Sequence, residues 1–592
     1  MAHKLSEIKL ENFKSIISQT FEISDYTPLI GYNNAGKSNI LSGIKWLLRK
    51  SSLSADAFNQ VGTPVSMEGT IDGIDEDLLD LLPQNHRNSI EPYIVENQLK
   101  IKRVQNNPSD TVANIRLFVH NPNAVDPNNP WIANPNGIDN ALNILFPEPI
   151  YIGAMENSED DVSKSRAGTT IGKLLGEIIE PIENQYGENI RNILDGLKGL
   201  LDADGIDRAV ELTDFDTAVN EKIDIFFPDV NIKLHIPTPE LKEVFNKGTI
   251  KVYEPHSPSG RDVSSLGHGA QRSVQMALVR HLAELKRAAQ NHVTTTLLLI
   301  DEPELYLHPQ AIEVIRDALK KLSTQGYQVV FSTHSAMMVT HEDVANAILI
   351  RKNILLGTYK RQTLKAAIPQ VTIDAPSQIQ LMFSLSNSSN ILFSEKIILT
   401  EGKTELRILP AIFEKVTGST LGIHKYALVR QGGVASTRKS MMVLNTMDLP
   451  TKAIVDLDYA FRNAVGDGYL LADDADLLAC QQYLLQIAVA NGIAIEADGY
   501  PTNRNSSMSA SDAFAFLASQ PAIQANINNL HTKLLVNNIW LWKRGAIEQH
   551  LGIHGKAEHI WANFVTQLKA NPLNIAVTDH TEITACVNWL LI

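Results

Sequence analysis

The sequence predicts a multi-domain α/β protein with at least two parallel sheets. At 592 residues, the chain is longer than a single hydrophobic core usually organises, so two to four domains are expected. Between residues 266 and 350, long helical patterns alternate with very apolar strands, which is typical of a parallel sheet covered by helices. A second unit of this kind begins with the strand pattern Glu395–Thr400.

The N-terminal region is expected to begin with strands and a helix. Alternating apolar residues predict strands over Leu5–Phe13 and Ser18–Ile23, and a short apolar run predicts a third strand over Thr27–Ile30. An apolar stripe then predicts a helix from Ser38 to Arg49.

The central region changes in character along the chain. Strand patterns continue to about residue 118, and the Asn- and Pro-rich stretch from His120 to Gly137 predicts a loop. From Thr169 to about Leu212 the pattern is helical, which fits either a plain helical subdomain or a dimerisation arm. The strand patterns of this region are at 65–74, 92–103, 230–235 and 249–253.

The C-terminal third continues the second α/β unit. An amphipathic helix is expected over Thr404–Val416, followed by strands over Tyr426–Val429 and Lys452–Val455. The stretch Ala375–Asn390, rich in Ser, Gln and Asn, is a plausible linker before this unit.

Composition excludes several classes of protein. The only cysteines are Cys480 and Cys586, which excludes a Cys-rich zinc module and argues against a disulfide framework. No apolar run reaches the roughly 18 to 20 residues that span a bilayer, so we expect a cytoplasmic protein that does not engage a membrane. The formal net charge of −14 counts mildly against nucleic acid as a partner, although a local basic groove is compatible with it.

A phosphate-binding loop is the strongest motif. Gly31 to Ser38 reads Gly-Tyr-Asn-Asn-Ala-Gly-Lys-Ser, between a short strand and an amphipathic helix, and this context makes a chance Gly-rich turn a poor alternative. Lys37 would reach the β- and γ-phosphates of ATP, and the Ser38 hydroxyl would ligate Mg²⁺. The residues of this loop expected to contact the nucleotide are Asn33, Asn34, Gly36, Lys37, Ser38 and Asn39.

Two adjacent acids follow a buried strand far downstream. Leu297–Ile300 leads into Asp301 and Glu302, and paired acids at a strand end are costly unless they serve a site. Asp301 would hold Mg²⁺ through water, and Glu302 would polarise the attacking water. The next apolar strand, Val329–Phe331, leads to His334, which could sense a γ-phosphate.

The long separation between Lys37 and Glu302 resembles the split heads of ABC ATPases of the SMC and RecF type. Ser265–Arg272 resembles the ABC signature before a long helix, and Glu304–Pro309 resembles the D-loop. Gln60 is a weaker candidate for the Q-loop glutamine.

The signature departs from that pattern in one respect. Gly267 occupies the position of the usual serine, so the γ-phosphate contact would come from backbone N–H groups around Gly267 and Gly269, or from Ser264 or Ser265. Slow hydrolysis is therefore expected. Because the signature of one such head completes the ATP site of another, the resemblance implies at least a homodimer.

Three carboxylate clusters occupy the C-terminal third. Glu401 ends an apolar strand and Glu405 follows one helical turn later, Asp456 and Asp458 end the next buried strand, and Glu548 follows the apolar segment Ile539–Trp542. A single acid at a strand end is often structural, but this combination could surround one or two Mg²⁺ ions, which prefer carboxylate oxygens. Two ions would support cleavage of a phosphodiester.

These clusters resemble the Toprim fold, and the order of an ABC-type head followed by Toprim resembles the OLD (overcoming lysogenization defect) family of nucleases. The resemblance implies that Glu401, Glu405 and Asp456 bind one metal, with Asp458 and Glu548 nearer a second. A serine often stands two residues before the last acid, where this chain has Ala546, so the second ion would be loosely held or need Mn²⁺. The lysine that stabilises the phosphate is Lys556 or Lys543.

The resemblance implies four regions. Residues 1–155 would carry the N-terminal part of the ATPase with the phosphate-binding loop, and 156–245 a helical insertion that could support dimerisation. Residues 246–385 would carry the signature, Asp301, Glu302 and His334, and 391–592 the Toprim nuclease domain.

The preferred hypothesis is an ATP-gated, Mg²⁺- or Mn²⁺-dependent DNA endonuclease or nickase in anti-phage defence. It would assemble as a homodimer or higher oligomer through its heads and helical insertion. A defence partner is possible, either a retron reverse transcriptase with its RNA–DNA or a helicase. The alternatives are a RecF-like DNA clamp whose Toprim domain docks nucleic acid without cleaving it, and an ATP-dependent signalling switch. A basic rim around Glu401 and Asp456 would favour a nucleic-acid function, and its candidates are Arg430, Arg438 and Lys439.

Overall fold

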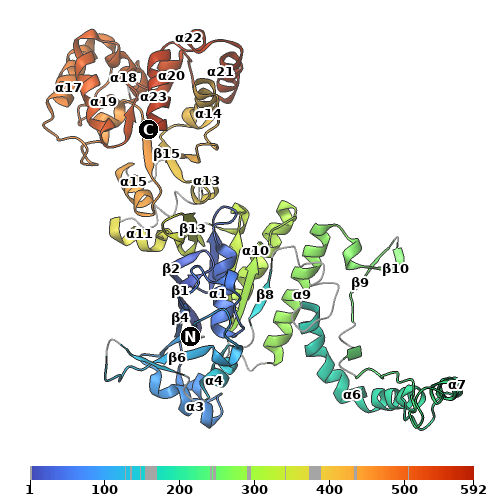
Figure 1. The fold of residues 1–592 in the computed structure, drawn as a ribbon. Coiled ribbons are helices and arrows are strands. Elements are labelled where there is room, and N and C mark those ends of the chain that lie inside the picture. The colour runs from blue at the N-terminus through green and yellow to red at the C-terminus, as the bar shows by residue number, and fades with distance from the viewer. Residues whose placement is uncertain are drawn as a thin grey trace. The chain divides into compact units, whose positions relative to one another are not determined.

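The chain folds into two compact units in the computed structural model (Figure 1). The first comprises Met1–Lys14, Glu22–Tyr26 and Ser38–Thr333, and the second comprises Ser15–Phe21, Thr27–Lys37 and His334–Ile592. The residues described by the structure are 3–126, 129–133, 137–146, 149–153, 170–240, 243–244, 248–255, 257–289, 295–340, 342–371, 388–431, 437–504 and 506–592. The change of character near residue 155 and most of the predicted linker at 375–390 lie outside them.

An antiparallel sheet in the first unit has the strand order β7-β6-β5-β4-β1. The strong alternation of its sequence reflects one buried face, as in β5, where every second residue from Leu99 to Gln105 is buried. The short strand β7 lies inside the stretch that composition predicted to be a loop, so that prediction is wrong in part: Trp131 and Ile132 pair with His120 and Val119. The bounds are β1 Lys4–Phe13, β4 Val65–Asp72, β5 Gln98–Gln105, β6 Arg116–His120 and β7 Trp131–Ala133.

Parallel strands in the same unit have the order β12-β11-β8. Every residue of β11 and of β12 is buried, which explains why both segments read as apolar runs rather than as alternating strands. The predicted alternation of helices and strands is thereby confirmed. The bounds are β8 Ile150–Ile152, β11 Thr296–Asp301, β12 Tyr327–Thr333, α9 His268–Ala289 and α10 Pro309–Ser323.

The remaining elements of this unit are mostly helical, and α6 lies beside α9 (Figure 1). The single helical pattern expected over 169–212 is divided between α6 and α7, with turns between them. The bounds are α2 Glu76–Leu79, α3 Gln84–Ile90, α4 Ile138–Leu145, α6 Thr170–Leu201, α7 Val210–Ile223, β9 Lys251–Glu254 and β10 Ser257–Asp262.

The strand predicted at 230–235 is wrong. Within the described part of the chain this segment pairs with no strand, and helix side chains bind its backbone instead. The Asn220 amide donates to Ile232 O (2.9 Å) and accepts from Ile232 N (2.8 Å), and Asp216 Oδ1 accepts from Leu234 N (2.9 Å). The apolar alternation that suggested a strand consists of exposed residues, because Ile232 and Leu234 are each 41% exposed.

One group of strands in the second unit has the order β2-β14-β13-β3. Strand β13 pairs in parallel with β3, which leads into the phosphate-binding loop, and in antiparallel fashion with β14. The bounds are β2 Ile16–Glu22, β3 Tyr26–Ile30, β13 Ile348–Asn353, β14 Gly357–Lys360, α11 Leu364–Val371 and α13 Ser388–Leu392. Helix α1, Lys37–Leu48, begins at the lysine of the phosphate-binding loop.

A second sheet in this unit is entirely parallel, with the order β16-β15-β17-β18. Its strands are β15 Lys396–Thr400, β16 Tyr426–Arg430, β17 Thr451–Val455 and β18 Ile539–Leu541. The predicted strands and helix of this region are confirmed. The helices are α14 Lys403–Thr417, α15 Thr437–Thr446, α16 Asp458–Arg462, α17 Ala475–Ala488, α18 Ala510–Ala518, α19 Gln524–Leu535, α20 Ile547–Leu551, α21 Glu558–Ala570, α22 Leu573–Ala576 and α23 His580–Leu591.

Large apolar side chains fix this second sheet in place. Helices α14, α21 and α23 pack together (Figure 1) over a core that includes Phe413, Trp542 and Trp561. Because all four strands are parallel, their carboxyl ends meet at one edge, where residues that follow the strands converge.

Among the described residues, no helix combines the length and the hydrophobicity that crossing a bilayer requires.

Candidate functional site

The phosphate-binding loop packs tightly against its own unit. A Cβ at Gly31 would come within 2.5 Å of Ile350 O, and one at Gly36, where φ is +104°, would come within 2.2 Å of Thr358 Oγ1. Asn34 also has a positive φ, of 64°. Only glycine meets these constraints at positions 31 and 36 without a shift in neighbouring atoms.

The loop lysine is directed back toward the loop and toward the predicted switch histidine. Lys37 Nζ donates to Gly31 O (3.0 Å) and Tyr32 O (3.2 Å), and it lies 2.8 Å from His334 Nε2. The structure therefore brings together two of the residues predicted to contact the γ-phosphate.

The acids Asp301 and Glu302 form a turn held by hydrogen bonds within the first unit. Ser332 Oγ donates to Asp301 Oδ1 and accepts from Glu302 N (3.0 Å). Arg272, which is fully buried, donates from Nη2 to both Asp301 O and Glu302 O (2.8 Å each). The signature helix α9 thus clamps the turn that carries both acids. Sequence analysis had not assigned this role to Arg272.

The signature and D-loop segments touch within this unit. The rings of His268 and Tyr306 are 5.4 Å apart, and a Cβ at Gly269 would come within 2.7 Å of Tyr306 O. Gly267 lies in an open position with nothing near its Cβ direction. Gln60 lies in a loop whose backbone is held by the Asn12 side chain, which accepts from Gln60 N (2.7 Å) and donates to Gln60 O (3.0 Å).

The carboxylates of the C-terminal sheet converge at the carboxyl ends of β15 and β17, as the strand order requires. One oxygen from each of Glu401, Asp456 and Asp458 lies within 4.8 Å of the others, a grouping that could hold a metal ion. Asp456 N donates to Glu401 Oε2 (3.3 Å), which ties the two strand ends together.

Glu405 and Glu548 form a buried pair beside this group, being 2% and 4% exposed. Glu548 Oε1 accepts from Thr404 Oγ1 (2.6 Å) and lies 3.6 Å from Lys556 Nζ, which is also 4.0 Å from Asp456 Oδ2. Asp458 is thus in the group with Glu401 and Asp456. The resemblance had instead implied Glu405 in that group, with Asp458 and Glu548 nearer the second ion.

The two candidate lysines have different surroundings. Lys556 faces the carboxylates, whereas Lys543 forms an ion pair with Glu582 (2.8 Å). This geometry favours Lys556 as the lysine of the site. Among the candidates for a basic rim, Arg438 donates to Asp467 O (2.6 Å) and stacks on Tyr469, so it has a structural partner.

The electrostatics of the cluster suit a cation. Desolvation raises the pKa of Glu401, of Asp458 and especially of Asp456, and the charges of neighbouring carboxylates raise it further for Glu401 and Asp456. Burial raises the pKa of Glu405 to about 7. Asp456, Glu548 and Glu405 hold the pKa of Lys556 above its usual value although its burial opposes this. A bound cation would relieve the repulsion among these acids.

The residues present fit one or two divalent ions. Asp456 Oδ1 is buried and has no hydrogen-bond donor among the described residues, as expected of an oxygen reserved for a ligand. All five acids offer the hard oxygen donors that Mg²⁺ and Mn²⁺ prefer. The charges of both Glu405 and Glu401 raise the pKa of Asp456, so this carboxylate interacts with acids of both groups.

Two family models match different parts of the chain. Residues 4–80 and 84–339 match the family model described as an AAA ATPase domain, and residues 392–458 match the model described as the TOPRIM domain of overcoming lysogenization defect protein-like sequences. The Old nuclease of Escherichia phage P2 is 36% identical over 604 aligned residues, with complete coverage of both chains. The chain belongs to the OLD family. The resemblance seen in its motifs is thereby confirmed.

More distant relatives cover parts of this OLD-family protein. The OLD nuclease of Thermus scotoductus is 22% identical over 48% of this chain and 53% of its own length. An SMC head bound to the C-terminal winged-helix domain of ScpA matches 61% of this chain with a TM-score of 0.36 and 16% identity. The match to the ATPase family model supports the ATPase-head fold expected from the sequence.

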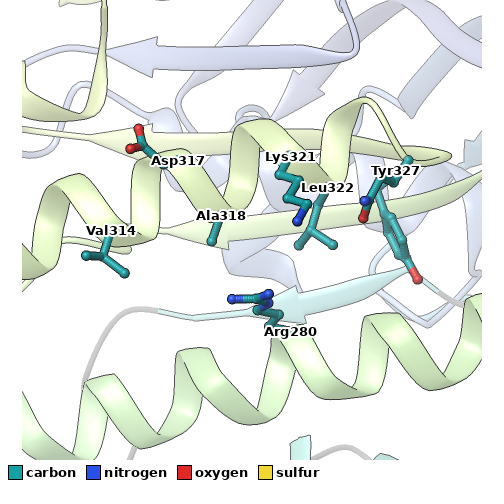
Figure 2. A pocket seen from close by; sticks show the side chains of 8 residues that line it. Arg280, Val314, Asp317, Ala318, Lys321, Leu322 and Tyr327 are labelled. Carbon is teal, nitrogen blue, oxygen red and sulfur yellow. The ribbon is translucent and has the colours of Figure 1, made fainter.

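A surface groove in the first unit is lined by residues other than those of the two candidate sites. Figure 2 shows Val314, Asp317, Lys321 and Leu322 along α10, with Arg280 of α9 across from them. Its volume is about 530 Å³, and its lining combines apolar side chains with both signs of charge. It contains neither the phosphate-binding loop nor the carboxylate cluster, so it contributes no functional group to either site.

Proposed function

We propose that this protein is a divalent-metal-dependent DNA endonuclease or nickase that is gated by ATP and acts in anti-phage defence. The single observation that carries the proposal is the convergence of five acids and Lys556 at one edge of the C-terminal sheet. A surface that only docks DNA would gain nothing from acids clustered close to phosphates, so this arrangement favours cleavage over the clamp alternative.

Each residue of the cluster has a proposed task. Glu401, Asp456 and Asp458 would hold one cation, and Glu405 and Glu548, with Asp456 between the groups, would hold the second. Bound Mg²⁺ or Mn²⁺ supplies the Lewis acidity that activates water and neutralises charge developing at the scissile phosphodiester. Lys556 would contact a nonbridging phosphate oxygen and stabilise its added negative charge in the transition state.

The ATP-binding residues have equally specific tasks. Lys37 would neutralise the β- and γ-phosphates, Ser38 and Asp301 would hold Mg²⁺, and Glu302 would orient the attacking water. His334, in contact with Lys37, would report whether a γ-phosphate is present. A homodimer would complete each ATP site with the signature of the other copy.

Gating is supported by a continuous set of contacts within the second unit. Tyr32 of the loop donates to Lys352 O (2.7 Å) and accepts from Lys352 N (2.9 Å), so the loop is bonded to β13. The neighbouring Arg351 on β13 places Nε 2.7 Å from Glu395 Oε1, and Arg361 places Nη2 2.6 Å from Glu395 Oε2.

Glu395 directly precedes β15, the strand that ends at Glu401. A change in the loop could therefore be transmitted through two buried arginines to the strand that carries the first metal ligand. A cavity of about 500 Å³ adjoins this path, and its lining includes Tyr32, Asn33, His334, Arg351, Glu395 and Lys425.

The test is cleavage of supercoiled and single-stranded DNA with Mg²⁺ or Mn²⁺, with and without ATP, by the wild type, Glu401→Ala and Lys37→Ala. The proposal expects cleavage that Glu401→Ala abolishes and that responds to ATP only while Lys37 is intact. Metal-dependent DNA binding without cleavage in every condition would instead support the clamp. Cleavage by the wild type with no response to ATP would overturn the gating part alone.

A further inference from the structure

Thr404 contacts the second carboxylate pair from a separate part of the chain. It lies in the first turn of α14, is 1% exposed, and is 144 residues away from Glu548 in the sequence. Its Oγ1 donates to Glu548 Oε1 at 2.6 Å, a short, charge-assisted hydrogen bond.

Among the described residues, one other side chain is recorded close to the Glu548 carboxylate. Glu548 lies in the first turn of α20, where the N-cap residue is Ala546, a side chain without a hydroxyl. The other donor near Oε1 is Lys556 Nζ, 3.6 Å away, on a side chain that is 54% exposed. Lys556 is therefore largely in contact with solvent, whereas Thr404 is enclosed by protein.

We propose that Thr404 is the positioning residue of the second cation position. Its hydroxyl engages one oxygen of Glu548, so the orientation of the carboxylate is set before a cation binds. This inference rests on the proposed metal-dependent function, and it makes the hydroxyl of Thr404, rather than any residue of α20, the group that orders Glu548.

A hydroxyl with only a structural role would affect stability and not cation affinity. If Thr404 only satisfied its own hydrogen-bonding capacity, its loss would lower stability but leave cation affinity intact. A positioning role instead changes the affinity of one cation and leaves the other unchanged. Removing a partner of a metal ligand typically weakens binding by about 10- to 100-fold.

The test measures Mn²⁺ binding to the full-length protein without DNA, by titration calorimetry and electron paramagnetic resonance. Thr404→Ala and Thr404→Ser both lose the methyl group, and only the serine keeps the hydroxyl. We expect the weaker Mn²⁺ site to lose about 10- to 100-fold in affinity in Thr404→Ala and to recover in Thr404→Ser. Thr417→Val is the matched control, because Thr417 Oγ1 at the far end of α14 donates to the backbone at Phe413 O (2.7 Å).

Glu548→Ala distinguishes the proposed role of Thr404 from the existence of the second cation position. Unchanged Mn²⁺ binding in Thr404→Ala, together with loss of the weaker site in Glu548→Ala, would overturn the role of Thr404 while keeping the second position. Two unaltered Mn²⁺ sites in Glu548→Ala would overturn the second position itself. Equal weakening in Thr404→Ala and Thr404→Ser would show that packing, not the hydroxyl, holds Glu548, and would also overturn the inference.

Discussion

Replacement of Glu395 by glutamine should uncouple ATP from DNA cleavage. Glu395 joins two arginines, Arg351 and Arg361, whose side chains are only 4% and 6% exposed. Glutamine has nearly the same shape, but it places an NH₂ group where one arginine needs an acceptor. One of the two ion pairs is therefore lost, and the other becomes a hydrogen bond from an arginine to an uncharged amide oxygen.

The magnitude follows from this burial. Removing one partner of a buried charge pair costs about 3 to 5 kcal/mol, and the retained amide oxygen should reduce the loss to about 2 to 3 kcal/mol. Coupling between two sites is typically worth about 1 to 3 kcal/mol, or roughly 5- to 150-fold in affinity. The interaction energy lost at Glu395 is therefore as large as a typical coupling free energy, which is enough to uncouple ATP binding from DNA cleavage.

The assay is plasmid nicking at fixed Mg²⁺ with and without ATP, alongside ATP hydrolysis. We expect the ratio of the two nicking rates to depart from one in the wild type and to approach one in Glu395→Gln, with hydrolysis retained. Glu558→Gln is the control, because its ion pair with Arg407 is exposed at 68% and 57%. A full ATP response in a folded Glu395→Gln protein would refute the proposed path.

Two further predictions concern buried groups outside the carboxylate cluster. Arg272→Lys keeps the charge but loses the paired hydrogen bonds to the turn at Asp301, so we expect about 2 to 3 kcal/mol lower stability in denaturant unfolding and a loss of ATP hydrolysis. Burial lowers the pKa of His550 to about 4, below the value near 6.5 of the unfolded chain. The uncharged His550 therefore contributes about 3 kcal/mol to the free energy of unfolding above pH 6.5, and this contribution is lost as the pH falls toward 4. His550→Gln should flatten the dependence of the unfolding free energy on pH in this range.

Each of these predictions has an internal check. Normal hydrolysis by a stable Arg272→Lys protein would show that the clamp on the turn is dispensable. The matched control for His550→Gln is the same substitution at the exposed His559, His559→Gln. An unchanged slope in His550→Gln between pH 6.5 and 4 would show that other groups cause the acid instability.

The sequence predicted the acids of the site because each follows a strongly patterned element. Glu401 and Asp456 come directly after buried strands, and the parallel order of β15 and β17 necessarily brings their ends together. The grouping of the acids was not accessible in the same way. It depends on side-chain directions at helix starts, which placed Asp458 with Glu401 and set Glu405 beside Glu548.

Contacts between distant segments were beyond sequence reasoning. The hydroxyl of Thr404 stands next to Glu405 in the motif, but its bond to Glu548 depends on the packing of two helices. The same holds for Arg272, which the signature motif contains without revealing its target. The wrong strand at 230–235 has a related cause, because apolar alternation does not show whether a partner strand or helix side chains will bind the backbone.

The most direct test of the central claim is Asp456→Asn, assayed in parallel for Mn²⁺ binding and for DNA cleavage. Asp456 is grouped with Glu401 and Asp458, and Lys556 Nζ lies 4.0 Å from its Oδ2 and 3.6 Å from Glu548 Oε1. The buried Oδ1 of Asp456 has no protein donor among the described residues. The substitution preserves shape and removes the charge. We predict that it abolishes cleavage and weakens both Mn²⁺ sites, while the wild type is inactive in EDTA. Cleavage by Asp456→Asn at the wild-type rate, or by the wild type in EDTA, would contradict a metal-dependent nuclease at this site.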